Sequence, residues 1–215
     1  MGKILARLVH EMENHAPFTI FGALTGIAIM IIIVYGNLLD YISPISENIF
    51  YILHPTHVFF SAIVTTTIFI KYGKKNIWLA LIIGYTGSIG IATISDSIIP
   101  YLGEIILGLN NPEVHIGFIE APLRTNIPAI IGILIAYWRG VTKLPHAGHV
   151  LISTWASLFH IIAAMGSTVT FFQMLGIFVF LFLAVWLPCC TSDIAYPILF
   201  SMKSTDGKSK SEKNH

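Results

Sequence analysis

The sequence predicts an all-α integral membrane protein with six transmembrane helices, built as a 3+3 internal repeat. Its composition, its apolar runs and a duplicated pair of motifs support this prediction. Hydrophobic residues make up 55% of the 215 residues and charged residues only 11%, whereas a soluble domain carries about 25% charged residues. The mean hydropathy is +0.78. Several apolar runs approach the roughly 20 residues that a helix needs to cross a hydrocarbon core of about 30 Å.

The first predicted element is an amphipathic helix over residues 1–15, which we expect to lie at the membrane interface because its apolar residues share one stripe. Six predicted spans follow this helix. The fourth is the shortest and begins among prolines, so it could also be tilted, be partly re-entrant, or extend back into residues 116–124. A basic tail at 201–215 is expected to be disordered. The six predicted spans are 17–38, 51–70, 77–99, 125–138, 148–167 and 171–190.

Positive charges are confined to alternate connections between these spans. Eleven of the 12 Lys and Arg residues lie before span one, between spans two and three, between spans four and five, or in the tail. Arg124 is the exception. Positively charged loops remain in the cytoplasm, so both termini are predicted to be cytoplasmic and the protein to lie in the cell membrane. Residues 103–121 then form an acidic extracytoplasmic loop.

Two motifs occur twice, in the same order. H-x-x-H-V-x-x-S begins at His54 and again at His146, 92 residues later, and S-D-x-x-x-P-x-L begins at Ser95 and again at Ser192, 97 residues later. The offsets are nearly equal, which indicates two related halves, 16–102 and 122–200. Because each half has three spans, the two halves must run in opposite directions. Inverted repeats of this kind are typical of secondary transporters.

The duplicated histidines and aspartates are the predicted metal ligands. Histidines three residues apart share one helix face, imidazole suits zinc and other transition metals, and added carboxylates favour harder ions. Opposite orientation of the halves would place the first set near the outer face and the second near the inner face. The predicted ligands are His54, His57 and Asp96 in the first set and His146, His149 and Asp193 in the second, with Glu104, His115, Cys189 and Cys190 as weaker candidates.

Each of these residues also has a structural interpretation. The histidines and aspartates could sit among lipid headgroups or bond backbone groups freed by Pro100 and Pro197. The cysteines could be small buried apolar residues. The acidic residues of the 103–121 loop could simply form a solvated face.

An ion or proton pathway is predicted from polar residues inside the spans, because ionisable side chains are costly in a bilayer and mark functional paths by default. His160 lies eleven residues from His149, which is about 16 Å along a helix. That depth is close to the bilayer midplane, where histidine suits a proton relay. The serines are expected to pack helices or to bond a histidine. The predicted pathway residues are Asp96, Asp193, His160, Ser61 and Ser153.

These features predict a multi-pass transporter of a divalent or heavy-metal cation, with proton coupling because protons compete with the cation for the same groups. No catalytic residue is predicted. One alternative is a membrane-embedded metal-dependent enzyme with a lipidic substrate, which needs three ligands on one ion and an open position. Histidine sets at opposite faces argue against an enzyme, and converging sets would argue against transport. The other alternative is a small membrane subunit of a larger complex.

The expected partners follow from this function. They are the lipid bilayer and a small inorganic cation or protons. The protein could also form a homo-oligomer, and no nucleic acid is expected to bind.

Overall fold

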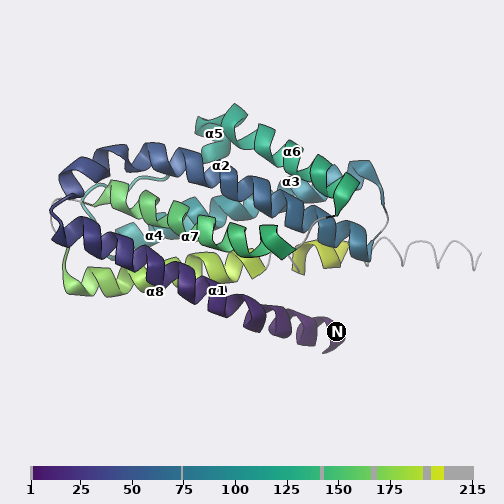
Figure 1. The fold of residues 1–215 in the computed structure, drawn as a ribbon, viewed down its shortest axis with the longest axis horizontal. Coiled ribbons are helices and arrows are strands. Elements are labelled where there is room, and N and C mark those ends of the chain that lie inside the picture. The colour runs from purple at the N-terminus through teal and green to yellow at the C-terminus, as the bar shows by residue number, and fades with distance from the viewer. Residues whose placement is uncertain (1, 74, 141–142, 166–168, 191–194, 201–215) are drawn as a thin grey trace, which may run out of the picture.

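The computed structural model describes residues 2–73, 75–140, 143–165, 169–190 and 195–200, and the regular structure of these residues is helical, without strands. The long helices lie side by side along one axis (Figure 1). Side chains are described except those of 2–12, 14–15, 143–147 and 190. The elements are α1 (Gly2–Tyr35), α2 (Leu39–Tyr72), α3 (Ile77–Thr93), η1 (Ile94–Ile98), α4 (Ile99–Ile106), α5 (Gly117–Glu120), α6 (Pro122–Arg139), α7 (Lys143–Ala164) and α8 (Phe171–Cys190).

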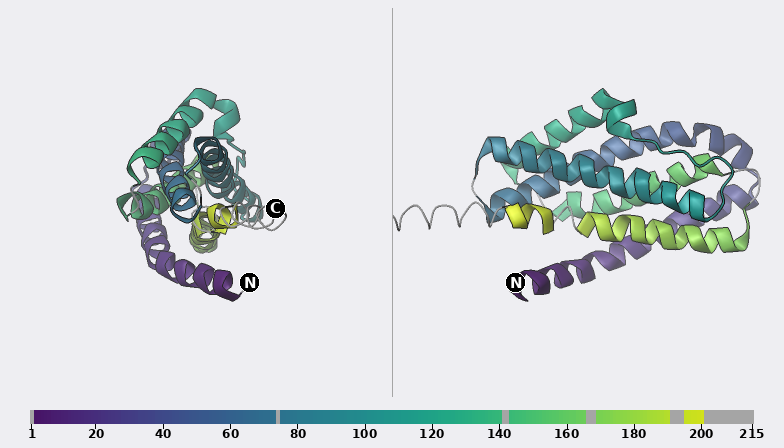
Figure 2. Two further views of the ribbon diagram at one scale, coloured as in Figure 1. Left: turned by 90° about the vertical axis from the view of Figure 1, so that its right-hand side faces the viewer. Right: turned by 180° about the vertical axis from the view of Figure 1, so that it is seen from behind.

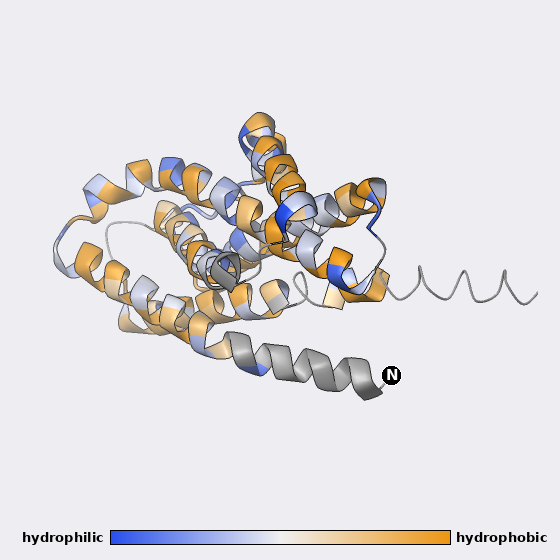
Figure 3. Ribbon diagram, turned by 45° about the vertical axis from the view of Figure 1, so that its right-hand side comes forward, coloured by the Kyte–Doolittle hydropathy of each residue, from blue (hydrophilic) through white to orange (hydrophobic). Residues whose placement is uncertain are grey.

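Four helical stretches are long and apolar enough to cross a bilayer: Ala16–Tyr35, Leu39–Tyr72, Ile77–Ile106 and Phe171–Cys189. They coincide with the first, second, third and sixth predicted spans. The apolar part of α7, Gly148–Ala164, is shorter. Apolar positions run the length of the helices (Figure 3), and many large hydrophobic side chains are exposed, among them Ile32, Trp138 and Phe172. An apolar exterior on a helical bundle is what lipid requires, and the fold is that of an all-α membrane protein.

Several helix boundaries differ from the sequence prediction. Helix α2 begins at Leu39 rather than at residue 51, and it continues through Pro44 and Pro55. The third span continues to Ile106 rather than ending at 99. The predicted start of the second span, residue 51, was too late for two reasons. Asp40 and Glu47 lower the local hydropathy, and each proline resembles a helix break.

The longer helices change the depth of the predicted ligands. His54 and His57 lie near the middle of α2, and Asp96 lies well inside its helical stretch. The sequence had placed all three near helix ends. Residues 2–15 are also not a separate element, because α1 is one helix that passes through Pro17.

Helix α2 is the centre of the bundle and packs against α3, α6 and α7. Glycines permit these close contacts. A Cβ atom on Gly132 of α6 would lie 2.5 Å from the carbonyl oxygen of Phe59, and one on Gly84 of α3 would lie 2.3 Å from Thr66 Oγ1. Small residues let membrane helices approach closely. The packing therefore fixes the position of α2 and of its two histidines.

The segment that carries Asp96 is a π-helical turn within an otherwise α-helical stretch. The Ile99 N–H bonds the carbonyl of Ile94, five residues back, and Pro100, the next residue, has no N–H to donate. A wider turn accommodates a proline without ending the helix, and π turns are frequent at functional sites. Asp96 sits in the middle of this turn and is fully buried.

The two ends of the bundle differ in charge. The acidic end, where α1 meets α2 and α7 approaches α8, holds Glu47 and Glu113. The basic end holds Lys71, Lys75 and Arg139. The start of α1 and the segment 195–200 both lie toward the basic end (Figures 1 and 2).

The connection 107–116 runs back from the acidic end along the bundle, so that α5 and α6 begin beside the middle of α2 (Figure 2). The Tyr51 hydroxyl donates a short hydrogen bond to Glu120. A Cβ atom on Gly117 would lie 2.6 Å from the His54 ring. The predicted 103–121 loop is therefore partly helical and packed into the bundle. Non-helical backbone at membrane depth occurs only where protein or a water-filled cavity surrounds it.

Candidate functional site

A polar seam runs through the interior of the bundle along one face of α7. His149, Ser153, Ser157 and His160 follow one another at spacings of four, four and three residues, and all four are buried. Such spacings place side chains on one helix face. The seam extends over about 16 Å of helix, roughly half the thickness of a hydrocarbon core.

The middle of the seam is the Asp96 cluster, which consists of His54, His57, Ser95, Asp96 and Ser153. Asp96 Oδ2 accepts hydrogen bonds from Nδ1 of His54 at 3.0 Å and of His57 at 2.7 Å. Asp96 Oδ1 accepts from the hydroxyls of Ser95 at 2.6 Å and Ser153 at 2.7 Å. The proximity predicted for the first histidine pair and its aspartate is confirmed. These four hydrogen bonds use the full acceptor capacity of the buried carboxylate.

These bonds assign the tautomers of both histidines. A carboxylate oxygen accepts, so Nδ1 of each ring carries the proton and Nε2 is left with a lone pair in the neutral imidazole. Nε2 of His54 is buried without a hydrogen-bond partner and faces Gly117. Nε2 of His57 faces away from Asp96, toward α8, where it lies 4.0 Å from Cys189 Sγ.

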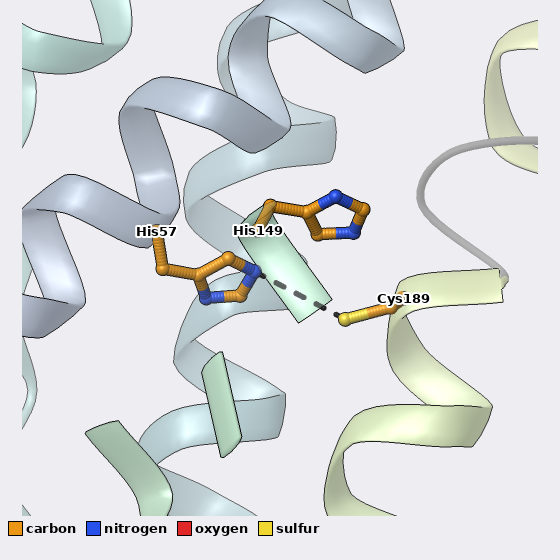
Figure 4. Close-up of side chains that lie close together, drawn as sticks. All are labelled: His57, His149 and Cys189. Atoms are coloured by element: carbon orange, nitrogen blue, oxygen red, sulfur yellow. Dashed lines mark hydrogen bonds between the residues drawn. The ribbon is translucent and has the colours of Figure 1, made fainter. Parts of the chain in front are cut away.

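His57, His149 and Cys189 form a three-residue group that we call the metal trio. Their side chains point toward a common space from α2, α7 and α8 (Figure 4). All three are buried, and their candidate ligand atoms lie within 4.8 Å of one another. The two imidazole rings are stacked, with centroids 5.7 Å apart and 7° between their planes. Ligands of one tetrahedral zinc ion are about 3.5 Å apart at the usual bond lengths, so a small contraction would bring the three atoms onto an ion.

The trio overturns the predicted separation of the two histidine sets at opposite faces. His57 comes from the first motif and His149 from the second, yet their rings are in contact. The reason is the length of α2, which carries His57 to the middle of the bundle, where α7 crosses it. Asp96 was predicted as a metal ligand, but its carboxylate instead accepts a hydrogen bond from Nδ1 of His57, the ring nitrogen that faces away from the trio.

This arrangement has the chemistry of a metal site. Metal-bound histidines usually donate their second ring N–H to a carboxylate, which fixes the tautomer and the ring orientation. His57 makes that bond to Asp96. Two imidazoles and one thiolate suit Zn²⁺ and other borderline or soft ions better than Mg²⁺ or Ca²⁺. Three protein ligands also leave a fourth position open for water or substrate.

A second carboxylate–histidine group, the Glu104 cluster, lies toward the acidic end and consists of Glu104, His115 and His160. Glu104 is fully buried, and its Oε1 accepts from His160 Nδ1 at 2.6 Å. Its Oε2 accepts from the Glu113 backbone N–H at 3.3 Å. The backbone N–H of His115 donates to His160 Nε2 at 3.4 Å. Glu104 is therefore not part of a solvated loop face, because α4 carries it into the bundle.

A cavity of about 240 Å³ at the acidic end reaches this second cluster and is lined by Glu47, Asn111, Glu113, His115 and His160, among others. A larger cavity, of about 560 Å³, lies beside the start of α6 and does not touch the cluster; it is lined by Glu47, Tyr51 and residues 120–124. Burial lowers the pKa of His115, and neighbouring His160 lowers it further, against the opposing effect of Glu47, Glu113 and Glu104.

Phe50 separates the two clusters. Its fully buried ring stacks on His54 with centroids 5.2 Å apart, and meets the His160 ring edge to face, also at 5.2 Å. An aromatic ring neither carries a proton nor coordinates a cation as a ligand. The seam therefore consists of two polar compartments with an apolar plug between them.

The remaining predicted residues are distributed as follows. Ser61 is buried on α2, one turn beyond His57 toward the basic end. His160 lies near the acidic end of α7 rather than at the midplane, and Ser153 occupies the middle of that helix. Glu104 and His115 do not join the trio. His146, Cys190 and Asp193, and with them the second histidine–aspartate contact, lie outside the described residues, as does the tail at 201–215.

Sequence reasoning missed Phe50, Ser157 and Gly117. A signal existed for Ser157, which lies four residues from Ser153 on the α7 stripe. Phe50 and Gly117 have no such signal, because their roles depend on contacts with distant segments.

No protein-family model matches the chain, and neither a curated protein nor a solved structure is significantly similar to it. The site must therefore be interpreted from its own geometry.

Proposed function

We propose that the protein is a transporter of a divalent transition-metal cation, with Zn²⁺ as the test ion, and that the metal trio is its central binding site. The observation that carries this proposal is the convergence of the buried donors His57, His149 and Cys189 inside the bundle. The trio lies on the same polar face of α7 as the cavity-lining Glu104 cluster, on the other side of the Phe50 plug. Acidic and imidazole side chains inside a membrane bundle are costly, and by default they mark an ion or substrate pathway.

The proposed topology has six spans in two inverted halves, with both termini in the cytoplasm. Lys71, Lys75 and Arg139 at the basic end support this orientation. The acidic end would then face outward. A local feature supports the repeat: Ala195 is π-helical, and under the 97-residue offset it is equivalent to Ile98, the last residue of the first π turn. The re-entrant course of 107–116 also resembles the interrupted elements that form transporter sites.

The choice of cation follows from the donor set. Imidazole and thiolate ligands favour zinc and its neighbours, and the His57–Asp96 bond supplies the supporting carboxylate. Glutamates around the outer cavities would raise the local concentration of cations. A hard ion such as Mg²⁺ would find too few oxygen ligands at the trio.

The proposal is tested by Zn²⁺ entry into proteoliposomes that contain a zinc-sensitive dye. The double variant H57A/H149A should lose Zn²⁺ binding by more than about 100-fold and lose flux with it, and C189S should lower both. T154A is the matched control, because its hydroxyl is equally buried on α7 but bonds only the Val150 carbonyl. Wild-type flux in the folded double variant would contradict the proposal.

A second candidate function, a membrane-embedded metal-dependent enzyme, gains support from the convergence of His57 and His149, and the same convergence counts against transport. Three converging ligands with an open position are what metal-assisted catalysis requires. The same vesicles separate the two functions. A trio that binds one Zn²⁺ tightly, without exchange or flux, would favour the enzyme. Absence of Zn²⁺ binding would leave the small membrane subunit as the better interpretation.

A further inference from the structure

The Glu104–His160 pair is a buried acid–base pair that metal binding at the trio does not use. Resting on the proposed transport function, we propose that this pair is a separate proton-binding site, loaded from the acidic-end cavity, whose proton is exchanged for the transported cation.

The contacts of the pair define where the proton goes. His160 Nδ1 donates to Glu104 Oε1, and His160 Nε2 accepts from the His115 backbone N–H. The ring is therefore neutral, and the carboxylate is the group with unused acceptor capacity. Loading transfers one proton from hydronium in the cavity to a Glu104 oxygen, which leaves water and a neutral carboxylic acid. Release reverses that step and requires no other reactant.

The pair suits a proton better than a metal ion. The hydrogen bond of 2.6 Å between His160 and Glu104 leaves no space for an ion between the two groups. Within the described residues, the trio is the group whose His, Cys, Asp or Glu ligand atoms converge. Burial of a lone carboxylate beside a neutral imidazole is also costly, and a bound proton removes that charge.

The surroundings supply protons from one side. His160 lines the cavity of about 240 Å³ together with Glu47 of α2, and Glu113 and His115 of the returning connection. Glu120 of α5 lies 3.6 Å from His115. Helix α8 approaches with uncharged groups, Phe180 over Gly103 and Gln173 at the Leu107 carbonyl. The acidic rim raises the local concentration of cations, including protons.

The plug formed by Phe50 keeps the proton site distinct from the metal trio while leaving the two electrostatically coupled. Glu104 lies eight residues from Asp96, about 12 Å of helical rise. Charges at that separation interact appreciably in a low-dielectric interior. A cation arriving at the trio therefore favours loss of the proton from Glu104, which is the basis of exchange.

The first test uses metal-free protein in detergent and so does not depend on transport. Difference infrared spectra between alkaline and acidic pH should contain a protonated-carboxyl band that E104Q removes. H160Q, which keeps a donor toward Glu104 but cannot titrate, should shift that band. D40N is the matched control, because Asp40 is an exposed carboxylate at the same end of the bundle, and its spectrum should keep the band.

The second test measures proton release with a pH dye in proteoliposomes while Zn²⁺ enters. In E104Q the protons moved per Zn²⁺ should fall toward zero, while Zn²⁺ binding at the trio, which also reports folding, stays near the wild-type value. An unchanged infrared band together with unchanged proton movement in E104Q and H160Q would overturn the inference. A wild-type band without any Zn²⁺ flux would instead uphold the proton site and overturn the proposed transport.

Discussion

The Asp96 and Glu104 clusters are built from the same residue types and differ in what surrounds them. Asp96 accepts four hydrogen bonds from side chains of α2, α7 and its own turn, and it lines neither the 240 Å³ nor the 560 Å³ cavity. Glu104 accepts one side-chain bond and one weak backbone bond, and its histidine partner lines a cavity.

The difference shows that the role of a buried carboxylate depends on its access to a cavity and on how many hydrogen bonds it accepts, rather than on its residue type. A carboxylate with every lone pair engaged holds its partners in place and presents the free nitrogen of His57 to the trio. A carboxylate with acceptor capacity to spare, close to water, can gain and lose a proton. Phe50 keeps the two environments apart.

The largest effect should come from D96N, which tests whether the Asp96 carboxylate fixes the tautomer and orientation of His57. The amide removes the charge and can no longer accept from both histidines and both serines, so His57 should lose its fixed tautomer. We expect Zn²⁺ affinity to fall about 10- to 100-fold, measured by calorimetry on purified protein, with D40N unchanged. Wild-type affinity in a folded D96N protein would show that the trio does not depend on the Asp96 cluster.

Removing the plug is expected to have the next largest effect. F50A would open space between His54 and His160, and water entering there would join the two compartments. Metal-free proton leak through the protein in vesicles should rise above the wild-type rate, at a cost in stability of about 3–5 kcal/mol. F50L keeps a large apolar side chain at this position, so its proton leak should remain at the wild-type level. Equal, low leak in both variants would mean that Phe50 does not separate the clusters.

G117A is expected to have a smaller effect, confined to the Asp96 cluster. Its Cβ would lie 2.6 Å from the His54 ring, so the ring must move and the geometry of its hydrogen bond to Asp96 must change. Overpacking of this kind costs about 1–3 kcal/mol, and Zn²⁺ affinity should fall several-fold less than in D96N. G90A is the control, because a Cβ there meets no atom within 4 Å, and it should preserve or raise the midpoint of thermal unfolding.

The smallest effect concerns pH and the Glu104 cluster. The pKa of His115 is lowered in the folded protein, so below about pH 6.5 the unfolded chain binds more protons than the folded one. The free energy of unfolding should therefore fall as the pH drops from about 6.5 through the folded-state pKa. Unfolding midpoints measured over this range should depend less on pH in H115Q. The same slope in both proteins would assign the dependence to other groups.

Local features of the sequence are enough to establish an all-α membrane protein. Apolar runs and the scarcity of charge are local properties, and a bilayer imposes them on any spanning helix. The motifs also pointed to His54, His57 and Asp96 as neighbours, because side chains three residues apart share a face and antiparallel helices bring equal depths together. The inverted repeat and the cytoplasmic termini remain predictions.

Which residues come together at the candidate site depends on how the helices pack. The meeting of His57 with His149 and Cys189 depends on where α7 and α8 cross α2, and the burial of Glu104 depends on a π turn that lets the helix continue past Pro100. Helix length was misjudged because charged residues and prolines at a helix end resemble a loop in a hydropathy window. Contacts between residues distant in the sequence are set by packing, and no local pattern encodes them.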